Sequence, residues 1–399
     1  MRRYTRLFYL LALSNFLFFL GNSLYILLPV FLKNMGASES YIGFMNNIDK
    51  IFTIITAVGI GSIMHGRDRI RLLRTGYMIL VVAYAAYLTV TSLTWSIILI
   101  RVMHGIGFSV AMIMGTSIIF DIVPIEDAAE AIGIYGITGA LSNALSPFFG
   151  EMLLSRGHSH YLIFALSVLL VSTSLAITFI MSRGERPGPA PDEPARSGSL
   201  RLLLEPRYLL MTLASIIFGG SFGVIITYLP NFIRTATSFR FSYFFIIYIC
   251  VLIIIRFTFL KIVTRINRNN LLIAVFANGA LMYLLFNSLN SLPVLILTGI
   301  MYGVTHGILF PVLNTTVVSL VHMHDRGRAN ALFIASFNGG MMSFAFALGF
   351  LIDRFHTYLV AFNVCAVMFL LAIGLMIIMK VKYSKPQIKI DPELSIEVE

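Results

Sequence analysis

An arginine and a histidine stand three residues apart in the segment RVMHGIGFS at 101–109, inside an apolar run from Ser96 to Phe120. A charged side chain near the centre of a bilayer costs at least ~2.5–3.5 kcal/mol, so such a group usually faces a cavity or a partner. Residues three and four apart share one face of a helix. Arg101 and His104 are therefore expected to point together into a cavity.

Asp49 and Lys50 lie within a second apolar run, 41–64. At ~1.5 Å per residue, Asp49 falls in the same layer as His104, with Arg101 one helical turn away. Neighbouring helical residues point about 100° apart, so Asp49 and Lys50 are not expected to face one spot. We expect Asp49 to carry a proton and Arg101 to favour its charged form by pairing with it. His104 is expected to relay the proton, because histidine titrates near neutral pH.

Structural explanations for these residues stay open. Arg101 could instead bond backbone carbonyls near the outer boundary of the membrane. Asp49 and Lys50 could form a purely structural ion pair with helix 4 or helix 11. His104 could simply hydrogen-bond a neighbouring helix.

Cations outnumber anions among the residues expected near mid-membrane, which include Arg256 and a second histidine, His306. A site of one sign concentrates ions of the other, so an anionic or zwitterionic, amphiphilic substrate is expected. Polar residues on helices 1, 10 and 11 are further candidates, although such residues often only pack helices together. The predicted substrate-binding residues are Asn22, Tyr25, Lys50, Arg256, His306, Asn314 and Asn338.

The composition places these residues in a membrane protein. Of the 399 residues, 58% are hydrophobic and 12% charged, and the mean hydropathy is +0.88. A soluble chain carries about a quarter charged residues. Cys250 and Cys365 each lie in an apolar run, which argues against a disulfide or a thiolate metal site.

Twelve apolar segments, each long enough to cross ~30 Å of hydrocarbon, predict an all-α membrane protein of two six-helix bundles. The bundles are expected at 1–182 and 207–381, joined by a linker at 183–206 and followed by a tail at 382–399. The predicted segments are 8–32, 41–64, 72–91, 95–120, 130–153, 160–181, 207–232, 241–263, 271–289, 293–320, 329–352 and 358–380.

Most of the 29 Lys and Arg residues fall on one side of these segments, together with both termini. Positive charge collects on the cytoplasmic side, so both termini are expected in the cytoplasm, in a bacterial inner membrane. The net charge of +11 then reflects topology rather than nucleic-acid binding.

The two halves of the sequence repeat. LPVFLK at 28–33 returns as LPNFIR at 229–234, and HGI at 104–106 returns at 306–308. Parallel six-helix repeats are typical of transporters with a substrate site between the halves.

These features resemble the major facilitator superfamily over essentially the whole chain. LIRVMHGIG at 99–107 resembles its helix-4 arginine motif, with His104 at a position usually held by Gln. GALSNALSPFFGE at 139–151 is similar to a degraded helix-5 motif of proton-driven exporters. MYGVTHGILFPVLN at 301–314 and DRGRANALF at 325–333 are similar to helix 10 and the loop into helix 11.

The resemblance implies a fold of twelve transmembrane helices and alternating access. It departs at 61–74, where His65 stands in place of the usual Asp. The resemblance implies that gating residues are Arg67, Arg69, Pro147, Gly150, Asp325, Arg326 and Arg328.

We therefore expect a monomeric secondary transporter surrounded by lipid, exporting a small organic solute in exchange for protons. A proton-coupled uptake symporter, a lipid-flipping member of the fold and a sensor or scaffold are the alternatives. No enzyme constellation, cofactor or phosphate loop is expected. HMHD at 322–325 is expected to be a solvated helix end rather than a metal site.

Overall fold

The computed structural model describes residues 4–64, 68–181, 205–258, 266–321 and 326–383. The described residues form helices and connecting turns, with no strand among them. The predicted all-α class is confirmed. Most of the predicted linker, and HMHD at 322–325, lie outside the described residues.

The first half begins with a span in three pieces, α1 (Arg6–Ser23), η1 (Leu24–Leu27) and α2 (Leu28–Asn34). Thr5 starts it by accepting a hydrogen bond from the Phe8 N–H, as a helix cap does. The remaining elements of this half are α3 (Glu39–Asn47), α4 (Asp49–Met64), α5 (Arg69–Ala86), η2 (Tyr87–Thr89), α6 (Ser96–Ile122), α7 (Ile125–Ser155) and α8 (His160–Met181).

The second half begins at Pro206, a residue suited to the first turn of a helix because it has no N–H to leave unpaired. Its elements are α9 (Pro206–Ala236), α10 (Phe241–Thr258), α12 (Arg268–Leu285), η4 (Phe286–Ser288), α13 (Leu292–Ser319), α14 (Arg326–Phe355) and α15 (Leu359–Tyr383).

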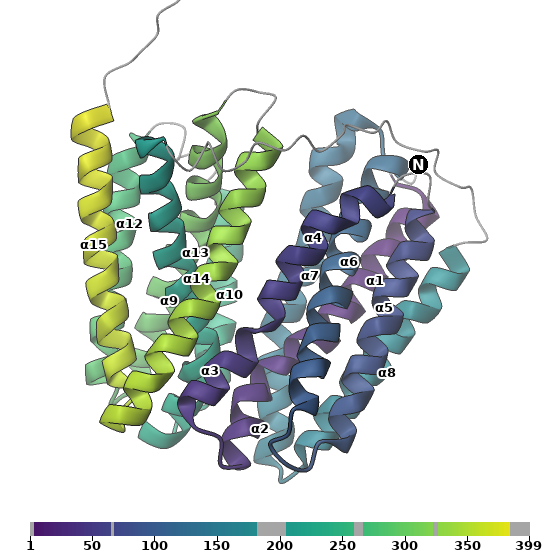
Figure 1. The fold of residues 1–399 in the computed structure, drawn as a ribbon, viewed down its shortest axis with the longest axis horizontal. Coiled ribbons are helices and arrows are strands. Elements are labelled where there is room, and N and C mark those ends of the chain that lie inside the picture. The colour runs from purple at the N-terminus through teal and green to yellow at the C-terminus, as the bar shows by residue number, and fades with distance from the viewer. Residues whose placement is uncertain (1–3, 65–67, 182–204, 259–265, 322–325, 384–399) are drawn as a thin grey trace, which may run out of the picture.

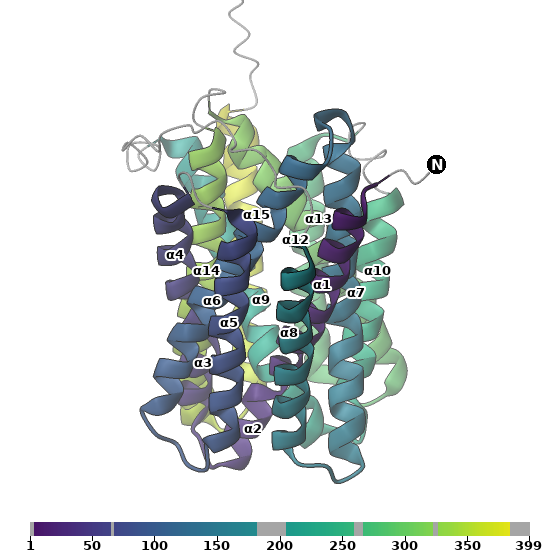
Figure 2. The same cartoon turned by 90° about the vertical axis from the view of Figure 1, so that its right-hand side faces the viewer.

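Within the described part of the chain, nine helices are long and apolar enough to cross a membrane, and α10 is a shorter apolar one. The α3–α4 pair and α7 bring the number of spans to the predicted twelve. The two halves lie side by side (Figure 1), and a quarter turn shows the helices of each running roughly parallel (Figure 2).

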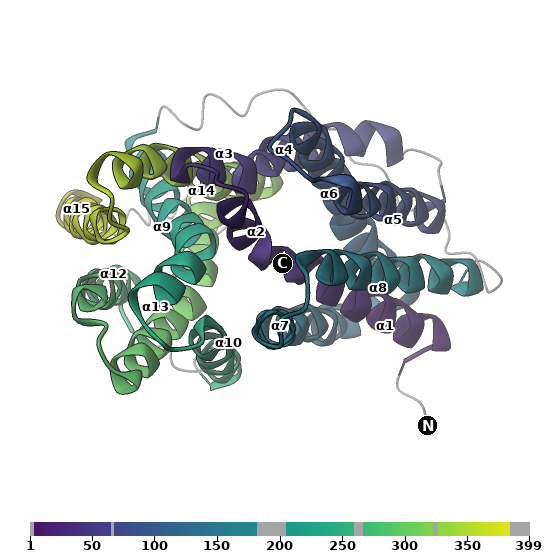
Figure 3. The ribbon, with the colours of Figure 1, turned by 90° about the horizontal axis from the view of Figure 1, so that it is seen from below.

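Both the start of α1 and the end of α15 lie at one face of the bundle, here called the terminal face. The other end, where α2 ends and α3 begins, is the opposite face. Seen from the opposite face, α3 lies against α14 and α7 against α10 (Figure 3), so these two pairs join the halves.

The second span departs from the sequence prediction. A single helix was expected over 41–64, but the span is interrupted at Ile48, between α3 and α4. The interruption falls directly before Asp49, where helix 4 of the fold, α6, approaches through Gly105. A Cβ on Gly105 would collide with the Asp49 carbonyl oxygen, so only glycine permits this backbone contact.

Candidate functional site

Asp49 lies at the centre of a cluster of charged side chains. Its Oδ1 accepts a hydrogen bond from Arg101 Nη2 at 2.6 Å, and its Oδ2 pairs with Lys50 Nζ at 2.8 Å. The Asp49 and Arg101 side chains are 2% and 3% exposed, whereas Lys50 is 24% exposed. The buried carboxylate therefore has two cationic partners, and only Lys50 connects the cluster to open space.

The expectation that Asp49 and Lys50 could not converge was wrong. Their Cβ atoms do diverge on the helix, but lysine has a flexible four-carbon stem. The stem turns back so that the ammonium group reaches the carboxylate of the preceding residue. It also places Nζ 5.9 Å from the centre of the Phe108 ring.

Arg101 donates hydrogen bonds to the backbone at the break in the second span. Its Nε donates to the Met45 carbonyl at 2.8 Å and its Nη2 to the Asn46 carbonyl at 2.5 Å. In a continuous helix these carbonyls would accept from the N–H groups four residues on. A guanidinium has five N–H donors in a fixed plane, so one side chain can serve both carbonyls and Asp49. The carbonyl-bonding alternative and the Asp49 pairing thus both describe Arg101, which is buried rather than directed into a cavity.

His104 is a further hydrogen-bond partner of the Arg101 guanidinium. Arg101 Nη1 lies 2.8 Å from His104 Nδ1, and His104 Nε2 lies 2.9 Å from Asn22 Oδ1. An arginine only donates, so Nδ1 must accept and the ring proton sits on Nε2, from which it is donated to Asn22. His104 is therefore neutral in this arrangement, and a second proton would require Arg101 to move away.

Aromatic residues close the site on the side of α1. Tyr84 donates to Asn22 Oδ1 at 2.8 Å, and the Tyr25 ring stacks on the Tyr84 ring at 4.4 Å between centroids. The Tyr25 hydroxyl is buried with no hydrogen-bond partner in the described part of the chain. Asn22 and Tyr25 thus belong to the Asp49 site. Tyr84 was missed because a tyrosine in an apolar helix gives no sequence signal of its own.

The remaining predicted substrate residues are not joined to this cluster. His306 accepts or donates a hydrogen bond with Tyr248 at 2.6 Å and stacks on Phe222 at 4.7 Å. Arg256 is exposed near the end of α10, and Asn314 is half-buried on α13. Asn338 bonds the Ile334 carbonyl of its own helix. The second half therefore presents an aromatic cluster in place of charges.

The predicted gating residues fall into three groups. Arg69 pairs with Asp121 within the first half, and Pro147 is buried inside α7. A Cβ on Gly150 would strike Leu27, so this glycine lets α7 pack closely on η1. The others carry no described side-chain contacts: Arg67 and Asp325 lie outside the described residues, and only the backbone of Arg326 and Arg328 is described.

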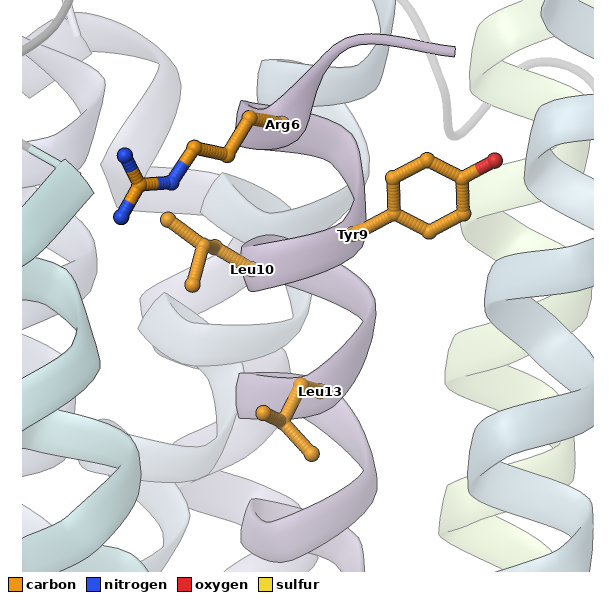
Figure 4. A pocket seen from close by; sticks show the side chains of 4 residues that line it. All are labelled: Arg6, Tyr9, Leu10 and Leu13. Atoms are coloured by element: carbon orange, nitrogen blue, oxygen red, sulfur yellow. The ribbon is translucent and has the colours of Figure 1, made fainter. Parts of the chain in front are cut away.

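A separate pocket lies on α1 near the terminal face, lined by Arg6, Tyr9, Leu10 and Leu13 (Figure 4). All four residues come from one helix, and Tyr9 and Leu13 are about half exposed. An arginine and a tyrosine near a helix end are typical of the membrane interface. The pocket lies away from the Asp49 cluster, and the described residues contain no group of side chains suited to a metal ion.

The sequence matches the profile of the Major Facilitator Superfamily over residues 11–287 and 261–394. The chain belongs to this superfamily, and it has the fold of the transporters in it. No curated protein sequence matches the chain.

Solved structures share the fold at low sequence identity. A nucleoside transporter, NupG, is 14% identical with a TM-score of 0.80, covering 94% of this chain and 99% of its own. A bacterial homolog of the human lysosomal transporter Spinster, inward-facing and unoccupied, is 14% identical with a TM-score of 0.69, covering 93% and 97%. The human organic anion transporter MFSD10 (TETRAN) is 15% identical with a TM-score of 0.65, covering 93% and 99%.

Proposed function

We propose that this chain is a secondary active transporter in which Asp49 carries the coupling proton. The observation that carries the proposal is the buried Asp49 carboxylate, bonded at the same time to Arg101 and Lys50. Burial of a carboxylate without these partners would carry a large desolvation free energy. Protonation of Asp49 removes the negative charge that forms both ion pairs. The protonated state and the ion-paired state are therefore mutually exclusive, as a coupling group requires.

The proposed cycle follows from these contacts. A proton that reaches Asp49 past Lys50 cancels the carboxylate charge and weakens its hold on Arg101. Arg101 also bonds the Met45 and Asn46 carbonyls at the end of α3. Loss of the Asp49 contact therefore changes the support of α3, so that protonation favours one of two conformations over the other.

The substrate that we propose is an anionic or zwitterionic organic molecule. Two full cations, Arg101 and Lys50, face one carboxylate, so the site retains positive charge. Lys50 is the partly exposed member of the cluster and would bind an anionic group in exchange for Asp49. The organic anion transporter among the similar structures is consistent with this class but shares only the fold.

We propose export as the direction, on the resemblance of residues 139–151 to a degraded helix-5 motif of proton-driven exporters. A substrate can be found by thermal stabilisation of the purified protein against a mixed library of anions and cations. Counterflow in vesicles under imposed proton gradients then gives the direction. Accumulation with the proton flow, rather than against it, would make the chain an uptake symporter.

The test of the coupling role is Asp49→Asn in proteoliposomes. The variant is expected to lose proton-driven accumulation by about 100-fold or more, as expected for a residue acting in the coupled step, while exchange of labelled for unlabelled substrate persists. Asp121→Asn is the comparison variant: it breaks the pair of Asp121 with the predicted gating residue Arg69, so it is expected to slow accumulation and exchange together. Proton-driven accumulation that survives in Asp49→Asn would refute the assignment.

A further inference from the structure

Two carboxylates at the opposite face hold the first turns of helices from the other half. Asp353, on α14, accepts from the N–H groups of Glu39 and Ser40 at 2.7 and 2.9 Å. Glu151, on α7, accepts from the N–H groups of Phe241 and Ser242 at 3.0 and 2.8 Å. In both cases the two oxygens of one carboxylate each take one of two successive N–H groups.

These two contacts are copies of one another. Glu151 and Asp353 are 202 positions apart, as are Ser40 and Ser242, and the repeat of HGI has the same offset. The carboxylate at the end of the fifth helix of each half thus accepts hydrogen bonds from the first turn of the second helix of the other half. This relation was missed because both acids lie at the ends of predicted segments, where a charge costs little, and only the repeat offset connects them.

The chemistry of the contact is strong and directional. The first N–H groups of a helix have no partner within the helix, and the positive end of the helix dipole favours a negative charge there. Hydrogen bonds to a charged acceptor are about twice as strong as neutral ones. The Glu151 contact is well shielded, since Glu151 is only 8% exposed, whereas Asp353 is partly exposed.

The neighbouring side chains reinforce the α3–α14 contact. Lys33 pairs with the Glu39 carboxylate at 2.6 Å, and the Tyr358 hydroxyl donates to the same carboxylate. Burial, followed by the hydrogen bond to Glu39, raises the pKa of the Tyr358 hydroxyl, so it remains a donor. A Cβ on Gly349 would lie 2.6 Å from the Ser40 Cα, which shows how closely the two helices approach.

We propose that Glu151 and Asp353 are a pair of repeat-related locks that keep the halves together at the opposite face. Side-chain hydrogen bonds between described residues of the two halves are concentrated on residues 29–47 and on Glu151 of the first half. Opening this face must break both locks, and breaking one leaves two helix N–H groups and a carboxylate to be solvated. The locks serve the alternating access of the proposed transporter.

Spin-label distances across each lock test this proposal in the full chain in lipid nanodiscs. One label pair is placed at Asn34 and Thr357, the other at Ser155 and Ser238, all exposed at the opposite face. The exposed Cys250 is first replaced by Ala. Glu151→Gln and Asp353→Asn are each expected to raise the ratio of long to short distances roughly tenfold, on the scale of one charged hydrogen bond. The double variant should raise it further.

Arg156→Gln and Arg354→Gln are the matched controls, because each changes an exposed charge next to a lock. Asp353→Glu keeps the charge but is one methylene longer in a closely packed contact, so an intermediate shift is expected. Distances that stay unchanged in folded Glu151→Gln and Asp353→Asn proteins, or that change equally in the controls, would overturn the proposal. The measurement uses neither substrate nor a proton gradient, so a failed transport assay leaves it standing.

Discussion

The two halves of the molecule carry chemically different residues at two positions that the repeat makes equivalent. Arg101 corresponds to Gly303 and Asp49 to Val251, each 202 positions on. Where the first half has a buried ion pair, the second half packs directly. A Cβ on Gly303 would lie 2.7 Å from the Val251 Cβ and 2.8 Å from the Tyr248 carbonyl oxygen.

The difference explains the shape of the second helix in each half. Arg101 supplies donors for the Met45 and Asn46 carbonyls, and the first-half span breaks at Ile48. The second half has no such donor at Gly303, and α10 runs unbroken from Phe241 to Thr258. The same scaffold thus holds a buried ionisable cluster in the first half and an aromatic cluster in the second.

Arg101→Met, compared with Arg256→Met, tests this division most severely. Removing the Arg101 guanidinium leaves a buried carboxylate and two carbonyls without their donor, which is expected to cost about 3–5 kcal/mol of stability. Arg256 is exposed on α10, so its loss should cost far less. Thermal unfolding of both variants in one detergent measures the difference. Equal losses would show that Arg101 is no more embedded than the exposed Arg256.

Gly105→Ala, compared with Gly307→Ala, tests the backbone contact beneath the ion pair. These glycines are repeat equivalents, but a Cβ on Gly105 meets the rigid Asp49 carbonyl, whereas one on Gly307 meets the Ile255 side chain at 3.2 Å. Overpacking should cost Gly105→Ala about 1–3 kcal/mol. Gly307→Ala should be near neutral, since alanine also favours the helix by up to about 1 kcal/mol. Thermal unfolding would contradict this account if both variants lost the same stability.

Much of this site could be predicted from the sequence, and the limit has a physical cause. Arg101, His104 and Asp49 are conspicuous because charge is costly in an apolar helix, and helical rise placed them in nearby layers. The break at Ile48 could not be predicted, because no Pro or Gly stands at positions 44–50 to interrupt the helix. It depends on a donor from another helix, 55 positions along the chain.

The cross-half contacts were beyond a helix-by-helix reading for the same reason. Asn46 and Asn47 both donate to the Thr227 hydroxyl, at 3.0 and 3.1 Å, and so tie α3 to α9. Each of the three residues alone is an ordinary polar residue of a membrane helix. Only the packing of the two halves shows that they meet.

Lys50→Gln, compared with Arg256→Gln, tests whether charge in the first half selects the substrate. Lys50 is the partly exposed cation of the Asp49 cluster, so its loss is expected to raise the apparent KM for an organic anion about tenfold, the scale of one charged hydrogen bond. Arg256→Gln should change it less. Uptake of labelled substrate over a concentration series measures both. The account would be contradicted if the two variants had equal effects, or if Lys50→Gln impaired transport of cationic substrates more than that of anionic ones. The selectivity for anions would then not come from the first half.

His104→Gln, compared with His306→Gln, should have the smallest effect and is the most informative about the histidines. Glutamine has one acceptor and one donor group, so it can accept from Arg101 and donate to Asn22 as neutral His104 does. Proton-driven transport should therefore change by about threefold or less, within the scale of one neutral hydrogen bond. His104→Leu removes the acceptor and should impair transport more. His306→Gln breaks the stacking on Phe222 and should leave the proton dependence unchanged. If His104→Gln abolishes proton drive while exchange persists, His104 is an obligatory proton relay, and the first half couples through two groups rather than one.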